Sequence, residues 1–107
     1  MTDCQNVIAK VVKDPHAVLD YSLDWAEWLE PGDTITASTW TAAAMNGALD
    51  MIVIDDMPFT TDTTTVWLSG GSPCEGYVVT NHVTTGDGRV DDRSLLVQVV
   101  ERSPIAT

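Results

Sequence analysis

Histidine and cysteine side chains supply many of the bases, nucleophiles and metal ligands of proteins, and this chain of 107 residues contains two of each. The histidines are His16 and His82, and no short ligand spacing such as C-x₂-C or H-x₃-H links them to each other or to a cysteine. A zinc site would have to recruit both histidines from distant parts of the sequence. We therefore predict no metal site, and we expect His82 to lie on the exposed face of a strand.

Paired carboxylates are a second possible source of chemistry. Asp55-Asp56 and Asp91-Asp92 invite comparison with calcium sites, because calcium takes several oxygen ligands. Neither pair has the D-x-[DN]-x-[DN]-G spacing of a dedicated calcium loop. We expect both pairs to be solvated turn residues.

The sequence also lacks the common catalytic motifs. Gly32-Asp33-Thr34 is reminiscent of an aspartic-protease half-site, but in that chemistry a glycine follows the threonine or serine, and here Ile35 follows Thr34. There is no G-x-S-x-G elbow, no P-loop and no G-x-G-x-x-G. We predict that the chain is not an enzyme, has no catalytic residues and binds no cofactor.

The composition fits one folded domain. Hydrophobic residues make up 44% and charged residues 20% of the sequence, close to globular averages, and a chain of this length normally closes around one core. The net charge of -11 would repel phosphate backbones and anionic membrane surfaces, so we expect neither nucleic acid nor a membrane as partner. The longest apolar runs are far too short to span a bilayer, and no signal peptide is evident. Cys4 and Cys74 allow at most one bridge and imply no disulfide framework.

The elements that would position any site are strands. Threonine and valine are abundant, and no extended run repeats every 3.6 residues. Turn signals recur every ~8 to 12 residues, and the segments between them predict strands at 17–23, 34–41, 48–54, 60–68, 76–84 and 94–101. The prediction is an all-β fold, an antiparallel immunoglobulin-like β-sandwich of six to seven strands, over residues 17–107. Residues 1–16 have no clear period, and we expect an N-terminal arm or an added edge segment there.

One short helical turn is expected within this sandwich. Asp24 and Glu27 have the spacing of a capping box, while Trp25, Trp28 and Leu29 fall on one face of a helical turn. The Pro-Gly-Asp sequence at 31–33 would end the turn.

The clearest strand is 76–84. Its alternation predicts that Tyr77 and Val79 lie in the core and that His82 lies on the opposite face. The Gly-Asp-Gly turn at 86–88 would pair it with the last strand, where one face carries Leu95, Val97 and Val99. In strand 34–41 the same alternation separates Ile35 from a face that carries Ser38 and Trp40.

Four tryptophans are too many for one compact core that also holds Tyr77 and the aliphatic strands. We place Trp67 in the core and leave Trp25 and Trp40 open between the core and the surface. Interfaces favour tryptophan, methionine and arginine. The candidate partner-binding residues are therefore Trp25, Trp28, Trp40, Met45, Met51, Met57, Arg89 and Arg93. Alternating charges at 89–93 predict local ion pairs, and the segment has either a structural or a contact role.

Two stretches of the sequence carry a recognisable set of residues. The first holds KDP at 13–15, LDY at 19–21, DW at 24–25, WL at 28–29, GDTI at 32–35 and STW at 38–40. The second holds VWLSGG at 66–71, GY at 76–77, VTN at 79–81, VTT at 83–85, GR at 88–89 and DDRSL at 91–95. In this order and spacing the chain resembles the fibre-to-tail adaptor family of tailed bacteriophages, small virion proteins of the neck and tail.

The resemblance implies a β-sandwich of immunoglobulin-like form without enzymatic activity. It also implies a structural role in the virion, where the protein would join a tail or neck component to a tail fibre in a symmetric, multi-copy assembly formed in the bacterial cytoplasm. The sequence departs from the family pattern at 42–57, which is unusually apolar and rich in methionine, and at 1–12. We expect such variable parts to carry partner-specific contacts.

Two other classes of function stay open at this point. One is a carbohydrate- or receptor-binding β-sandwich module, in which exposed tryptophans would stack on sugar rings. The other is a small enzyme or an inhibitor of a host protein. Saturable quenching of tryptophan fluorescence by oligosaccharides would favour the first of these over the adaptor.

Overall fold

The computed structural model describes residues 7–46 and 51–101, and these residues form seven strands and no helix. None of the described residues belongs to a helix that could cross a membrane. The strands are β1 (Val7–Lys13), β2 (Leu19–Asp24), β3 (Ile35–Ala44), β4 (Ile52–Asp56), β5 (Thr63–Gly70), β6 (Gly76–Thr85) and β7 (Val90–Val99).

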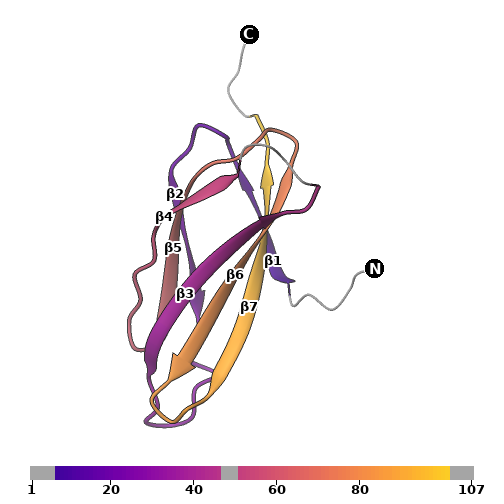
Figure 1. Ribbon diagram of the computed structural model, residues 1–107. Helices are drawn as coiled ribbons and strands as arrows, with labels where there is room; N and C mark the ends of the chain where they lie inside the picture. The colour runs from indigo at the N-terminus through magenta and orange to yellow at the C-terminus, as the bar shows by residue number, and fades with distance from the viewer. Residues whose placement is uncertain (1–6, 47–50, 102–107) are drawn as a thin grey trace.

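The strands make two sheets that face each other as a sandwich (Figure 1). One sheet has four strands in the order β1-β7-β6-β3, and the other has three in the order β2-β5-β4. As in the immunoglobulin arrangement, the third, sixth and seventh strands share one sheet and the second, fourth and fifth share the other, but β1 lies beside β7 instead of in the sheet of β2. The prediction of an immunoglobulin-like β-sandwich is confirmed. It is antiparallel except at one pair, because β1 runs parallel to β7.

Strand β6 lies in the middle of the larger sheet, as the sequence predicts. Tyr77, Val79 and Val83 are completely buried, and His82 lies on the opposite face with its side chain 51% exposed. The Tyr77 hydroxyl accepts a hydrogen bond from the backbone N–H of Ser72 at 2.8 Å, the arrangement of a tyrosine corner at the start of this strand. The predicted core face of β7 is also confirmed, since it buries Leu95, Val97 and Val99.

Strand β3 departs from the predicted alternation. The structure buries Ile35 together with Ser38 and Trp40, which the sequence pattern placed on opposite faces. The register with β6 shifts between Ile35 and Ala37, which marks a β-bulge. One extra residue reverses the alternation of the strand, so side chains before and after the bulge both reach the core.

Two other expected elements are wrong in detail. The expected helical turn after β2 is not formed. Trp28 and Leu29 N–H both bond to the Trp25 carbonyl, at 3.0 and 3.1 Å, but these bonds close a non-helical turn that Pro31-Gly32 soon ends. The strand expected at 48–54 as a buried element is observed only from Ile52, and only Ile52 of its described residues is buried. Strand β4 begins at Ile52 and lies at the edge of its sheet, so Val53 faces solvent, while residues 48–50 lie outside the described part.

Strand β1 falls within the first sixteen residues and forms the edge of the larger sheet. Its last residue, Lys13, is completely buried, and its ammonium group donates to the carbonyls of Asp14 at 2.9 Å and Gly70 at 2.8 Å. Desolvation lowers the pKa of Lys13, although the charges of Asp14 and Asp55 oppose this shift. The lysine thereby connects the end of β1 to the end of β5 in the other sheet. Cys74 is a free, exposed thiol, and Cys4 lies outside the described residues.

Candidate partner-binding site

Three loops meet at the lower end of the molecule in Figure 1, at residues 25–34, 57–62 and 86–89. Backbone hydrogen bonds join them directly. Trp25 N–H bonds to the Asp62 carbonyl at 2.8 Å, Ile35 N–H to the Thr61 carbonyl at 2.9 Å, and Gly86 N–H to the Thr34 carbonyl at 3.0 Å. Loops joined in this way present a single surface, and several of the residues that carry the family resemblance lie there.

A buried polar network anchors the first of these loops. The Trp25 indole N–H donates to the Thr64 hydroxyl at 3.0 Å and to the Asn81 side-chain oxygen at 3.1 Å. Thr64 donates to the same oxygen at 2.6 Å, and the Asn81 amide donates to the Ser38 hydroxyl at 3.0 Å and the Thr39 carbonyl at 2.9 Å. Asn81 therefore links both sheets and the Trp25 loop, which explains how a polar side chain is tolerated at complete burial.

The two arginines of the 89–93 segment stack on the two tryptophans of the 25–34 loop. The Arg93 guanidinium carbon lies 4.0 Å from the Trp25 ring centroid, and that of Arg89 lies 4.1 Å from the Trp28 centroid. The two indoles meet edge to face with centroids 5.0 Å apart. Arg89 also donates to the Trp28 carbonyl at 2.8 Å and lies 3.8 Å from a Glu30 carboxylate oxygen. We call these four stacked side chains, Trp25, Trp28, Arg89 and Arg93, the Arg–Trp stack.

Replacing Arg93 with alanine is expected to lower the free energy of unfolding by about 1 kcal/mol, because it removes a cation–π contact from a buried indole. Urea denaturation monitored by circular dichroism would measure the loss. Arg93→Lys should recover part of it, since lysine keeps the charge but not the planar guanidinium. A full loss of stability with both variants would contradict a role limited to stacking.

Asp33 is held by the loop that precedes Arg89. One of its carboxylate oxygens accepts from Thr34 N–H at 2.9 Å and from Asp87 N–H at 3.1 Å. Burial alone would raise the pKa of Asp33, but hydrogen bonds from the Thr85 side chain and from these two backbone groups, with the nearby charge of Arg89, hold the pKa below its usual value. The ionised carboxylate of Asp33 thus stabilises the contact between the 25–34 and 86–89 loops.

The Asp33 carboxylate is expected to make stability fall in acid. Its pKa is lower in the folded chain than in the unfolded chain, so its contribution is present above the unfolded pKa of about 3.9 and is lost as the pH falls through the folded pKa. Asp33→Asn should therefore melt below the wild type at pH 7, and the difference in Tm should shrink below about pH 4. A difference that does not change with pH would show that the charge of Asp33 does not matter.

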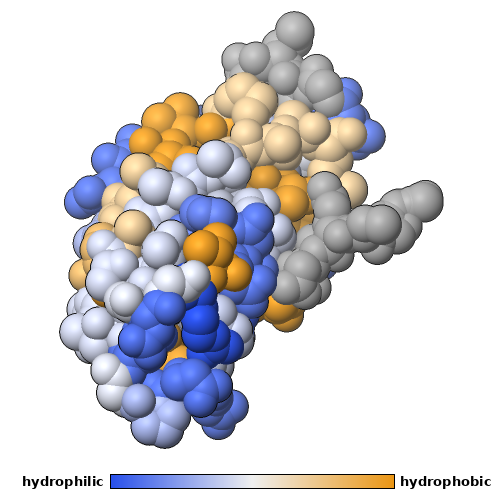
Figure 2. Space-filling model, turned by 60° about the horizontal axis from the view of Figure 1, so that its bottom comes forward, coloured by the Kyte–Doolittle hydropathy of each residue, from blue (hydrophilic) through white to orange (hydrophobic). Residues whose placement is uncertain are grey.

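A shallow open depression of about 410 Å³ lies beside the Arg–Trp stack, at an end that is mostly hydrophilic in Figure 2. Its lining contains three carboxylates and one hydroxyl but no histidine, cysteine or lysine, so it does not pair a nucleophile with a base of those kinds. The lining residues are Ala26, Leu29, Glu30, Pro31, Gly32, Asp33, Thr61 and Asp62.

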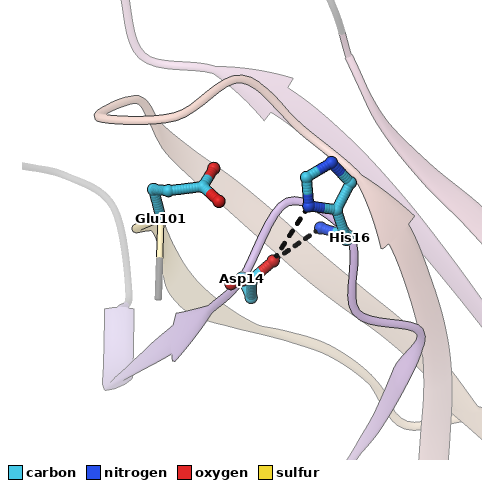
Figure 3. Close-up of side chains that lie close together, drawn as sticks. All are labelled: Asp14, His16 and Glu101. Carbon is cyan, nitrogen blue, oxygen red and sulfur yellow. Dashed lines mark hydrogen bonds and ion pairs between the residues drawn. The ribbon is translucent and has the colours of Figure 1, made fainter. Parts of the chain in front are cut away.

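One group of potential metal ligands forms that the sequence does not suggest. Asp14, His16 and Glu101 each offer a donor atom, and these atoms lie within 4.8 Å of one another (Figure 3). The Asp14 oxygen nearest the imidazole already accepts from His16 N–H at 2.8 Å, and the His16 side chain is largely exposed. This hydrogen bond shapes the turn after β1 and accounts for the positions of Asp14 and His16 without an ion.

Comparison with known proteins gives one family. A family model described as podophage GP4 fiber-tail adaptor protein gp77 matches residues 13–98, which is most of the chain. The chain belongs to this family. The match starts at the buried Lys13 and ends within β7, so it spans both sheets and the Arg–Trp stack but leaves out most of β1. A search of curated proteins finds no match. The resemblance stated from the sequence is thereby confirmed, and the gp77 family name describes a structural adaptor between fibre and tail of a phage.

Within this gp77-family chain, the predicted partner-binding residues separate into three groups. Trp25, Trp28, Arg89 and Arg93 come together in the Arg–Trp stack, where Trp25 is completely buried and Trp28 is partly exposed. Trp40 is only 4% exposed, because the bulge in β3 turns it inward. Met45, Met51 and Met57 are all exposed. Trp25 and Trp40 are therefore core residues, and the others keep surface that a partner can reach.

The placement of Trp67 in the core is wrong. Its neighbours Val66 and Leu68 are completely buried, whereas Trp67 is 37% exposed on the other side of β5. Successive residues of a strand face opposite sides of the sheet, so the two aliphatic neighbours and Trp67 could not share the core, and this signal is present in the sequence. Asn81 and Thr64, which organise the buried network, were not recognised as a pair because they lie in different sheets.

Proposed function

We propose that this chain is a non-enzymatic structural protein of a tailed-phage virion that joins a tail or neck component to a tail fibre. The family match over residues 13–98 is the observation that carries the proposal. Adaptor function requires a stable body with more than one contact surface, and the two-sheet sandwich provides such a body. We further propose that several copies of the chain assemble symmetrically with these partners. This assembly would take place in the cytoplasm of the bacterial host.

Two separated surfaces support an adaptor. Strand β3 spans ten residues, or roughly 30 Å at the usual rise, and separates the Arg–Trp stack from Met45. Met45 follows the end of β3 and is 56% exposed, beside a depression of about 270 Å³ lined by Ala43, Ala44, Met45 and Val78. In Figure 2, apolar residues gather in the upper part of the view, away from the mostly hydrophilic lower end. We propose that Met45 and Met51 contact one partner and that Trp28 and Arg89 contact another.

Purified virions provide the test. The chain should be found in virions in a fixed multiple relative to the fibre, and particles made without it should lack fibres while keeping heads and tails. Quantitative mass spectrometry and electron microscopy of both particle types would measure this. Finding the chain in infected cells but not in virions, or detecting turnover of a substrate, would contradict the proposal.

A carbohydrate- or receptor-binding module is the second candidate, because Trp67 offers an exposed indole of the kind that stacks on sugar rings. Saturable quenching of tryptophan fluorescence by oligosaccharides would favour this candidate. A titration without quenching would favour the adaptor.

A further inference from the structure

We propose that the outer face of the three-stranded sheet, centred on Trp67, docks an arginine side chain of a neighbouring virion protein. This inference rests on the adaptor function proposed above and names the chemistry of one of its contacts. We call this surface the Trp67 face; its outward residues are Asp20, Ser22, Val53, Asp56, Thr65, Trp67 and Ser69.

Trp67 occupies the centre of this face. It lies on β5, the middle strand of the sheet, and is 37% exposed although the residues on either side of it in the chain are completely buried. A tryptophan on the outer face of a central strand has no core to pack against. A large indole in this position is typical of the contact centres of protein interfaces.

Carboxylates flank the indole on both sides. Asp20 of β2 and Asp56 of β4 are both cross-strand neighbours of Trp67, and both are exposed. Cross-strand neighbours on one face lie about 5 Å apart at their Cβ atoms, so a group above the indole is within reach of both carboxylates. The bulge between Ile54 and Asp56 produces this arrangement, because it brings Asp56 opposite Trp67 one residue later than a regular strand would.

The three-stranded sheet carries negative charge that no cation of the sheet compensates, so a positively charged group of another protein would be attracted to it. Residues 14–88 contain twelve aspartates and glutamates but no lysine or arginine, and all three strands of the sheet lie within this range. Among the described residues, no salt bridge engages Asp20 or Asp56. The hydrogen bond that Asp56 accepts from Met57 N–H at 2.9 Å leaves its charge uncompensated.

Arginine is the cation that fits this surface. Its guanidinium is planar, stacks on aromatic rings and carries five N–H donors, so one side chain can cover Trp67 and donate to a carboxylate on each side. The same chain uses this chemistry internally, where Arg93 and Arg89 stack 4.0 and 4.1 Å from the centroids of Trp25 and Trp28. Neither depression described above includes Trp67, so the face is open and suits a protein surface better than an enclosed small molecule.

A nuclear magnetic resonance titration of the full chain with a hexa-arginine peptide tests the proposal. We expect the indole N–H signal of Trp67, assigned with a Trp67→Phe variant, to shift more than those of the other three tryptophans and to saturate. Asp20→Asn combined with Asp56→Asn should weaken peptide binding about fivefold, because two exposed ion pairs are lost. Trp67→Leu should weaken it by a similar factor through the lost cation–π contact, and Trp67→Phe should weaken it less.

A matched control separates this site from general attraction to an acidic protein. Asp92→Asn combined with Glu101→Gln removes the same charge from exposed positions in β7 and just after it, outside the three-stranded sheet and outside the three joined loops. This control should weaken binding less than twofold at physiological salt, because charges beyond about 8 Å are screened. Equal effects of the two double variants would overturn the proposal. So would a Trp67 signal that responds to neutral oligosaccharides and not to the peptide, which would assign the face to glycans.

Phage particles distinguish this inference from the adaptor function itself. Complementation with Asp20→Asn/Asp56→Asn should reduce incorporation of the chain into virions, while Asp92→Asn/Glu101→Gln should not. If the wild-type chain is present in virions and both variants incorporate equally well, the Trp67 face is not a docking surface but the adaptor function stands. If the wild-type chain is absent from virions, the adaptor function fails, and with it the arginine partner proposed here.

Discussion

A chain with aspartate in place of Val79 is expected not to fold. Val79 is completely buried on the central strand β6, between Ala42 of β3 and Leu95 of β7. An unpaired carboxylate there has no polar partner, and its burial costs several kcal/mol, against a total stability of about 5–15 kcal/mol for a domain of this size. Circular dichroism and the dispersion of the amide proton spectrum would report the loss of structure.

The control for this variant is Thr41→Asp, which places the same charge on the exposed face of the neighbouring strand β3. It should fold and melt within a few degrees of the wild type. A soluble Val79→Asp chain that melts cooperatively would show that Val79 does not lie in the core.

Asn81→Leu is expected to lower the free energy of unfolding by about 3 kcal/mol or more. The substitution removes the acceptor for Thr64 and Trp25 and the donor to Thr39 and Ser38, and each buried polar group left without a partner costs about 1–3 kcal/mol. For a domain of about 100 residues this corresponds to a fall in Tm of roughly 12 °C or more. Urea denaturation and thermal melting would both measure it.

Thr64→Val provides the comparison. It keeps the volume of the side chain and leaves the hydrogen bond between the Trp25 indole and Asn81 in place, so we expect a loss of only about 1 kcal/mol. An Asn81→Leu chain as stable as the wild type would mean that the network connecting the two sheets contributes nothing to folding.

The sequence predicts the sandwich where each strand follows an unbroken alternation. The inward faces of β6 and β7 are predicted correctly because no bulge interrupts the pairing of these two strands, so every second residue of the core stretch faces inward: Tyr77, Val79 and Val83 in β6, and Leu95, Val97 and Val99 in β7. The exposure of His82 follows from the same alternation. In these strands the local pattern and the burial agree, so no knowledge of the partner strand is needed.

The errors arise where a strand breaks its alternation or where a contact joins distant parts of the sequence. The bulge after Ile35 is invisible in a pattern of threonine and alanine, yet it decides that Trp40 is buried. The expected helical turn has the right spacing, but the few residues between Asp24 and Pro31 form a hydrogen-bonded turn and not a helix. The parallel pairing of β1 with β7 joins residues more than 80 positions apart, and short-range periodicity carries no information about it.

The candidate site could be predicted in part from residue types. Trp25, Trp28, Arg89 and Arg93 were selected because interfaces favour tryptophan and arginine, and the structure does bring them together. Their mutual stacking, however, is a contact between two segments of one domain, and only Trp28 and the two arginines keep part of their surface exposed. Residue type alone does not separate an internal contact from an external one.

The burial of Lys13 has a practical consequence for chemical labelling. The chain has two lysines, and the ammonium group of Lys13 is held by two carbonyls at complete burial, whereas Lys10 is exposed on β1. Apart from the α-amino group, amine-reactive dyes and cross-linkers should therefore modify the folded protein at Lys10 alone. Such reagents give a single attachment point on the larger sheet, and carboxyl-reactive cross-linkers are the ones that can report what lies against Trp67.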